Sequence, residues 1–226
     1  LERVVDALAM SGSVRRLVIV DEAAAVLKAV PALQPLHAEG LVRFVAPGES
    51  APASALKAFE AGAGEHPALL VTGDSALLTP AMVDGFCAGV KDGVDLCVGF
   101  AREETVAAAY PETRRTYLRF RDGGYSSCNL FALMTPQATR VLALWRDVTR
   151  HRKRPWRLVV AAFGWGALLR YVMGHLSLAD AFAVASARLD LTARPVVLPF
   201  ADAAIDVDKP SDFALAETIL KARNAA

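Results

Sequence analysis

The chain has 226 residues, of which 54% are hydrophobic and 22% charged, so a single domain with a large core is expected. A formal net charge of +1 gives no general reason to expect a nucleic-acid partner. No run of about 18 apolar residues occurs, which argues against a membrane-spanning helix. Three widely spaced cysteines without a CxxC pair predict reduced thiols in a cytoplasmic protein.

The first half of the chain alternates between two kinds of segment. Short β-branched runs predict strands over residues 16–21, 41–46, 68–71 and 95–101. Helical spacing predicts helices near residues 1–11 and over 22–29, 54–61 and 80–90, with Ser50 or Ser54 capping the third and Thr79 the fourth. This β-α-β-α order favours a mostly parallel sheet with flanking helices.

The second half adds a different strand type. Residues 116–121 alternate with period two, a turn follows at 122–124, and 128–134 form another apolar run. These strands predict an antiparallel addition to the sheet. The rest of the chain predicts a helix from residue 135, two helices between 155 and 189, a strand over 195–199 and a closing helix over 212–222.

Two acidic segments stand out as candidates for a ligand site. Asp74 directly follows the strand over 68–71, where ligands bind in open α/β sheets. Asp206 and Asp208 lie near the other end of the chain, on one side of the segment if it is extended. Two such carboxylates suit a divalent metal with a phosphate substrate. The alternatives are a turn role for Asp74 and helix capping by Asp208 or Ser211.

Four segments, taken in chain order, resemble the MobA-like nucleotidyltransferase (NTP transferase) family. Gly73-Asp74-Ser-Ala-Leu-Leu is similar to its "GDxPLL" segment, and Val207-Asp208-Lys-Pro-Ser-Asp-Phe to its C-terminal "D-T-P-E-D-L" motif. The segment 48–54 resembles the stretch that contacts the base, and Ser127-Cys-Asn129-Leu-Phe the strand that lines the acceptor pocket.

The resemblance implies a fold and an activity. The fold would be one domain over 1–226, a three-layer α/β/α Rossmann-like sandwich of the nucleotide-diphospho-sugar transferase (GT-A-like) type. The activity would move an NMP group from an NTP, CTP or GTP rather than UTP or ATP, to a small phosphorylated acceptor with release of pyrophosphate. Mg²⁺ would be held by Asp74 and Asp208, with Asp206 in reserve. The nucleotide would lie near Ser50, Ser54, Thr72 and Gly73, and the acceptor near Asn129.

One family element has no counterpart in these residues. The family begins with a strand and a glycine-rich loop, "G-G-x-G-x-R-M-G-x-x-K", which cradles the triphosphate, whereas Leu1 aligns with the helix that follows it. We expect this loop upstream of Leu1. The alternative is a catalytically silent nucleotide-binding or regulatory module. A GT-A glycosyltransferase is disfavoured, because its Asp-x-Asp would stand where this chain has Asp74-Ser75-Ala76.

The densest charged run covers residues 146–157. Such runs are usually solvated helix ends, and an acceptor-phosphate site is the next interpretation. Together with the apolar stretch over 158–169, this region offers a membrane contact through 146–169 as a weaker alternative. A role in the core or as a homodimer face is the favoured interpretation of the apolar stretch.

Overall fold

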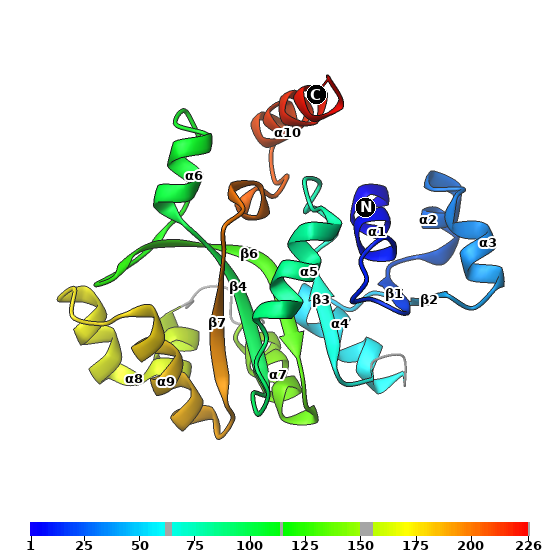
Figure 1. The fold of residues 1–226 in the computed structure, drawn as a ribbon. Helices are drawn as coiled ribbons and strands as arrows, with labels where there is room; N and C mark the ends of the chain where they lie inside the picture. Colours follow the sequence, from blue (N-terminus) through cyan, green and yellow to red (C-terminus); the bar gives the residue numbers. More distant parts are fainter. Residues whose placement is uncertain (62–64, 114, 150–155, 226) are drawn as a thin grey trace.

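The computed structural model describes residues 1–61, 65–113, 115–149 and 156–225 (Figure 1). The first half contains α1 (Glu2–Ala9), β1 (Leu17–Val20), α2 (Ala23–Ala29), α3 (Leu33–Ala38), β2 (Val42–Val45), α4 (Ala51–Glu60), β3 (Ala68–Val71), α5 (Pro80–Gly89), β4 (Leu96–Arg102) and α6 (Glu103–Ala109). The second half contains β5 (Leu118–Phe120), β6 (Gly123–Leu133), η1 (Pro136–Ala138), α7 (Thr139–Thr149), α8 (Trp156–Val172), α9 (Leu178–Leu189), β7 (Ala193–Leu198), η2 (Ala201–Ala204) and α10 (Pro210–Ala225).

Among the described residues, the main sheet has five strands in the order β3-β6-β4-β7, with β5 paired to β6. β4 and β7 are parallel, whereas β6 is antiparallel to β3 and to β4. β3, β4 and β7 therefore point the same way. The mixed sheet predicted from the sequence is confirmed, and the structure places the antiparallel strand β6 in the middle of the sheet.

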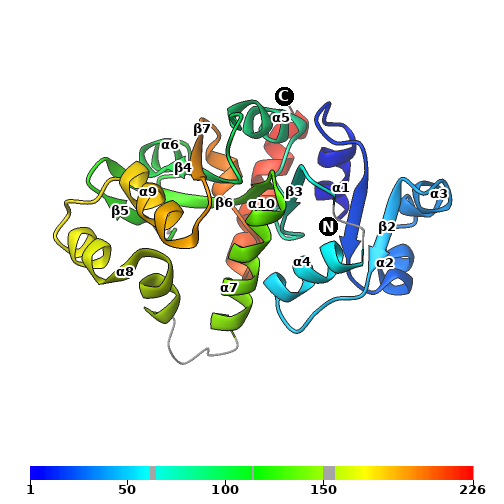
Figure 2. The same ribbon diagram turned by 90° about the horizontal axis from the view of Figure 1, so that it is seen from below.

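Successive side chains of the central strands enter cores on opposite faces of the sheet. Figure 2 shows α5 on one side of the sheet and α7 on the other. On β4, Cys97 and Ala101 pack with α1 and α5, whereas Leu96 packs on the other face with α4, α7 and the partly buried side chains of α9. The same period-two alternation places Leu130 and Leu133 of β6 in different cores. The result is the predicted three-layer α/β/α sandwich.

β1 and β2 form a separate parallel pair. Their core contains Ile19, Val42 and apolar residues of α2 and α3, and Val5 of α1 joins it. Val4, the preceding residue on α1, packs in the core of the main sheet. Helix α1 thus lies between the two sheets and contributes to both cores (Figure 1). The single domain over 1–226 stays a prediction.

Helix starts follow their capping residues. Ser50 accepts the N–H of Ala53 and caps α4, with Pro52 in its first turn, so α4 begins three residues before the predicted position. Thr79 caps α5 as predicted and accepts the N–H of Met82 over 3.3 Å. The short helices α3 and α6, of six and seven residues, were not predicted.

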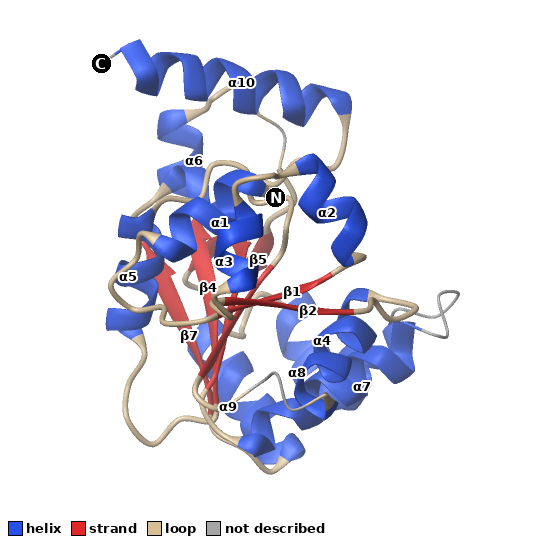
Figure 3. Ribbon diagram, turned by 90° about the vertical axis from the view of Figure 1, so that its right-hand side faces the viewer, coloured by secondary structure: helices blue, strands red, loops and turns tan. Residues whose placement is uncertain are grey.

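The carboxyl ends of β3, β4 and β7 lie at one edge of the sheet, where α6, η2 and α10 are also found (Figures 1 and 3). One polar cluster joins these three elements. The hydroxyl of Tyr110 donates to Asp202, and Arg223 of α10 pairs with the same carboxylate and donates to the carbonyl of Leu77. Burial, followed by the bond to Asp202, raises the pKa of Tyr110 well above its ordinary value.

Candidate functional site

Asp74 lies in a tight turn directly after β3. The hydroxyl of Thr72 donates to Oδ1 of Asp74 and lies 3.2 Å from the hydroxyl of Ser75. The N–H of Ala76 donates to the carbonyl of Asp74 over 2.8 Å. The Asp74 side chain is half-buried, and among the described residues its Oδ2 has no hydrogen-bond partner. One carboxylate oxygen is therefore held by the turn and the other is available to a ligand.

The two acidic segments meet through the backbone. The N–H of Val207 donates to the carbonyl oxygen of Asp74 over 3.2 Å. This bond joins the turn after β3 to the extended segment between η2 and α10, and Asp206 and Asp208 flank Val207 on either side. Chain folding therefore brings together the two acidic motifs that resemble those of the family.

Asp206 and Asp208 have different surroundings. The carboxylate of Asp206 accepts from Arg115 over 2.7 Å at Oδ1 and from the amide of Asn129 over 3.3 Å at Oδ2. The side chain of Asp208 is exposed, and within the described part of the chain it makes no side-chain hydrogen bond or ion pair. Asp208 therefore has the freer carboxylate, and Asp206 is held in a network.

Asn129 is positioned by an irregularity in β6. The pairing of β4 with β6 shifts register between Val98 and Phe100, opposite residues 127–131. At this bulge Asn129 adopts a left-handed backbone with φ 52°, which Asn tolerates better than most residues. Bulges commonly redirect a side chain beside a functional site. Here the bulge lets the Asn129 amide reach Asp206.

Two residues of this network were missed by the sequence reasoning as site candidates. Arg115 contacts Asp206 and lies 3.6 Å from Oδ1 of Asp212. Asp212 is the third residue of α10, and its Oδ2 accepts the N–H of Lys209 over 3.2 Å. An acidic residue at the third helical position is a recognisable capping pattern, so Asp212 could have been found. Nothing in the sequence around Arg115 indicates its role.

Ser50, Ser54 and Gly73 have local roles in the structure. Ser50 caps α4, and the hydroxyl of Ser54 accepts the N–H of Gly48 over 2.9 Å. Gly73 is exposed and lies against the chain start, since a Cβ atom added to it would be 3.6 Å from Cδ1 of Leu1. No hydrogen bond recorded among the described residues joins either serine to the Asp74 turn. Their contact with a nucleotide stays a prediction.

A metal at this place would find two separate carboxylates rather than a preformed cage. Across the described ranges, no group of three or more His, Cys, Asp or Glu side chains is placed to hold a metal ion. Mg²⁺ usually keeps several waters and needs only one or two protein carboxylates. Asp74 and Asp208 fit that requirement, because in the described part of the chain each has a carboxylate oxygen without a hydrogen-bond partner. The metal itself stays a prediction.

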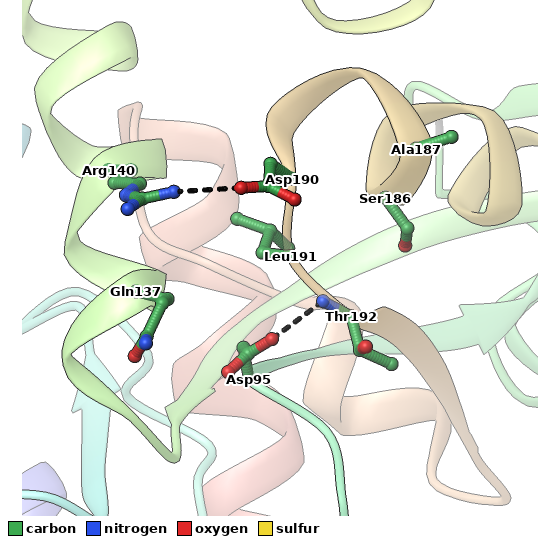
Figure 4. Close-up of a pocket in the computed structure, with 8 residues that line it drawn as sticks. All are labelled: Asp95, Gln137, Arg140, Ser186, Ala187, Asp190, Leu191 and Thr192. Atoms are coloured by element: carbon green, nitrogen blue, oxygen red, sulfur yellow. Dashed lines mark hydrogen bonds and ion pairs between the residues drawn. The ribbon is translucent and has the colours of Figure 1, made fainter.

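A cavity of about 500 Å³ lies elsewhere, near the amino-terminal end of β4 (Figure 4). Its charged groups already have partners. Asp95 accepts the N–H of Thr192 over 2.7 Å and the hydroxyl of Thr135, and Arg140 lies 3.6 Å from Asp190. Bonds to Thr135 and Thr192 lower the pKa of Asp95. The charged residues of the cavity therefore hold the ends of β4, α7 and α9 together. The cavity lies at the opposite end of the sheet from Asp74.

Most of the basic run over 146–157 lies outside the residues whose side chains the structure describes. The predicted phosphate, membrane and dimer contacts of 146–169 are therefore untested. On α8, Trp165, Leu169 and Val172 are exposed. In the parts of the chain that are described, no helix has both the length and the apolar character that crossing a bilayer requires.

Comparison with known proteins agrees with this fold. The structure matches a hypothetical transferase from Thermus thermophilus with a TM-score of 0.72 and 30% sequence identity, over 93% of this chain and 84% of that one. It also matches a 4-diphosphocytidyl-2C-methyl-D-erythritol synthase from Anaerococcus prevotii, with a TM-score of 0.58 and 10% identity over 97% and 88% of the two chains. No family model and no curated protein matches the sequence.

These similarities show the fold of the chain and the family to which it belongs. Its architecture is the Rossmann-like fold of NTP transferases, with the candidate site at the carboxyl edge of the sheet. By its identity and coverage, the chain belongs to the same family as the hypothetical transferase of Thermus thermophilus.

Proposed function

We propose that this protein is a Mg²⁺-dependent nucleotidyltransferase of the MobA-like kind, which moves an NMP group from an NTP to a small phosphorylated acceptor and releases pyrophosphate. The observation that supports this most directly is the hydrogen bond from Val207 to the carbonyl of Asp74. It joins the segments of the two motif carboxylates at the sheet edge where α/β proteins bind ligands.

Each residue of the site then has a role that its contacts support. Asp74 and Asp208 hold the metal, because both have carboxylate oxygen without a protein partner among the described residues. When bound, the metal neutralises charge on the phosphates as the α-phosphorus is attacked. Asp206 is bound to Arg115 and Asn129, which makes it a support for the site rather than a first ligand.

The nucleotide is proposed to lie over Thr72 and Gly73, towards the segment 48–54. In that segment, the backbone of Ala53 and Ser54 lies close to Gly48, since a Cβ atom added to Gly48 would be 2.8 Å from their backbone atoms. The exposed Gly73 leaves backbone accessible to a ligand.

The test is nucleotide binding by the complete polypeptide. Each of the four NTPs with Mg²⁺ is added in a thermal-shift measurement, since a ligand at 100 times its Kd stabilises by about 2.7 kcal/mol. For a chain of this size, that corresponds to a rise of about 5 to 11 °C in Tm. We expect CTP or GTP to give the largest rise, and EDTA to abolish it.

Turnover is measured as pyrophosphate release with the selected NTP and a panel of sugar and polyol phosphates. Release that depends on one acceptor supports the transferase. Selective binding without release for any acceptor identifies the silent nucleotide-binding module instead. A protein that neither binds an NTP with Mg²⁺ nor releases pyrophosphate contradicts the proposal.

A further inference from the structure

Arg115 forms an internal ion-pair network beside the candidate metal segment. It lies in the loop between α6 and β5, with 10% of its side chain exposed. Its Nη1 donates to Oδ1 of Asp206 over 2.7 Å, and its Nη2 donates to the carbonyl of the same residue over 3.3 Å. The guanidinium group therefore fixes both the side chain and the backbone of Asp206.

The same guanidinium reaches the start of α10. Nη2 lies 3.6 Å from Oδ1 of Asp212, a buried carboxylate. The other oxygen of Asp212 accepts the backbone N–H of Asp208 over 3.3 Å and that of Lys209 over 3.2 Å. Arg115 is thus connected to the backbone of Asp208 on both sides, through Asp206 and through Asp212.

Among the described residues, the charge balance of this arrangement depends on one cation. Arg115 is the cation recorded in contact with Asp206, and it also faces Asp212. Without it, the buried carboxylate of Asp212 and the partly buried carboxylate of Asp206 would lose the positive charge that both face, which low-dielectric surroundings make unfavourable. The planar fork of arginine can bridge two acceptors, which the single ammonium of lysine does less well. Within the described residues, the buried Nε of Arg115 still has no hydrogen-bond partner.

We infer that Arg115 is a positioning residue for Asp208, the carboxylate proposed to hold the metal. This inference rests on the proposed function. Arg115 acts through Asp206 and Asp212 and contacts neither the metal nor the reacting atoms. Its role is to keep the segment 206–209 in one conformation against the Asp74 turn, so that the two carboxylates are presented together.

The test compares Arg115→Met and Arg115→Lys with a matched control, Arg223→Met. Arg223 of α10 also bridges a carboxylate and a backbone carbonyl, those of Asp202 and Leu77. Among the described residues, Arg223 makes no hydrogen bond or ion pair with residues 206–209. Two quantities are measured in the complete protein. One is amide hydrogen exchange over 206–209 without metal, and the other is the Kd of Mn²⁺ with the NTP that binds.

In Arg115→Met we expect at least about tenfold faster exchange at Asp208 and Lys209 and a Mn²⁺ Kd raised about 10- to 100-fold, the usual range when a residue supporting a metal ligand is lost. In Arg115→Lys we expect smaller changes in both the exchange rate and the Mn²⁺ Kd than in Arg115→Met. Arg223→Met should lower the Tm while leaving the Mn²⁺ Kd within about twofold of wild type.

Two outcomes would overturn the inference while the proposed function stands. One is an unchanged exchange pattern in Arg115→Met. The other is faster exchange with an unchanged Mn²⁺ Kd, which would make Arg115 a residue of stability alone. If the wild-type protein binds none of the four NTPs in the presence of Mn²⁺, the proposed function fails first and the role of Arg115 fails with it.

Discussion

The backbone N–H of Val207 donates to the carbonyl oxygen of Asp74 over 3.2 Å, joining the turn after β3 to the segment that leads into α10. Because both partners are backbone atoms, the contact fixes the path of the two segments without using the neighbouring carboxylates. Asp74 and Asp208 therefore become neighbours through folding, although more than half of the chain separates them.

The first prediction concerns these two carboxylates. Asp74→Asn and Asp208→Asn should each reduce pyrophosphate release at least about 100-fold, a loss of about 2.7 kcal/mol in transition-state stabilisation, because a neutral amide binds Mg²⁺ poorly. In Asp74→Asn, the new amide oxygen can still accept the hydroxyl of Thr72, so the turn should persist. Steady-state kinetics and the Mg²⁺ dependence of NTP binding measure the effect.

A matched control for these variants is Asp92→Asn. Asp92 is an exposed carboxylate in the turn before β4. Its replacement should leave the kinetics and the Tm unchanged. If Asp74→Asn behaves like Asp92→Asn, Asp74 is a turn residue and not a metal ligand.

The second prediction tests the left-handed backbone at Asn129. Asn129→Ala should be less stable than Asn129→Gly by about 1 kcal/mol, because alanine is strained at positive φ and glycine is not. Both variants lose the amide that binds Asp206. Denaturant unfolding measures the stability difference, and equal stabilities would show that the left-handed conformation is absent in solution.

The third prediction separates capping from nucleotide binding at Ser50. Ser50→Ala should cost about 1 kcal/mol of stability, because the cap of α4 is lost. Thr79→Ala removes the same kind of cap from α5 and should cost a similar amount. If Ser50 also contacts the nucleotide, only Ser50→Ala will raise the NTP Kd, measured by titration calorimetry. Equal Kd values for the two variants would leave Ser50 as a cap alone.

The fourth prediction uses the buried thiol of Cys128, next to Asn129. Burial raises the pKa of Cys128 to about 12. The folded state therefore keeps this proton while the unfolded thiol loses it, and the free energy of unfolding falls as the pH rises from about 9 to about 12. Cys128→Ala should reduce that slope by up to about 1.4 kcal/mol per pH unit. The slope is measured by denaturant unfolding at several pH values, and an unchanged slope would contradict a raised pKa.

Sequence reasoning found the features whose cause is local. Strand β3, the Thr79 cap and the position of Asp74 all follow from residues within a few positions of one another. The strands β1 to β4 were predicted with errors of one residue at most at each end, whereas β6 begins at Gly123, five residues before the predicted start. By contrast, β6 lies in the centre of the sheet between β3 and β4, and its place depends on pairings between distant strands that no local pattern encodes.

The same division holds in the candidate site. The sequence singled out Asp74 and Asp208 as metal ligands with Asp206 in reserve, but only the structure showed how the surroundings of the three carboxylates differ. Arg115 lies 91 residues before Asp206 in the chain, and no periodicity or cap connects them. Asp212 had a local signal in its position at the start of α10, and this signal was interpreted only as the start of a helix.

The amino-acid sequence by itself determined the alternation of strands and helices, the caps and the chemical identity of the acidic segments, because these depend on side-chain type and short-range spacing. The tertiary structure decided which carboxylates, among the described residues, have an oxygen without a protein partner and which are paired with a cation. That outcome depends on burial and on charges brought close by folding, as with Arg115 and Asp206. Ionic contacts act over a few ångströms in space, whatever the distance along the chain.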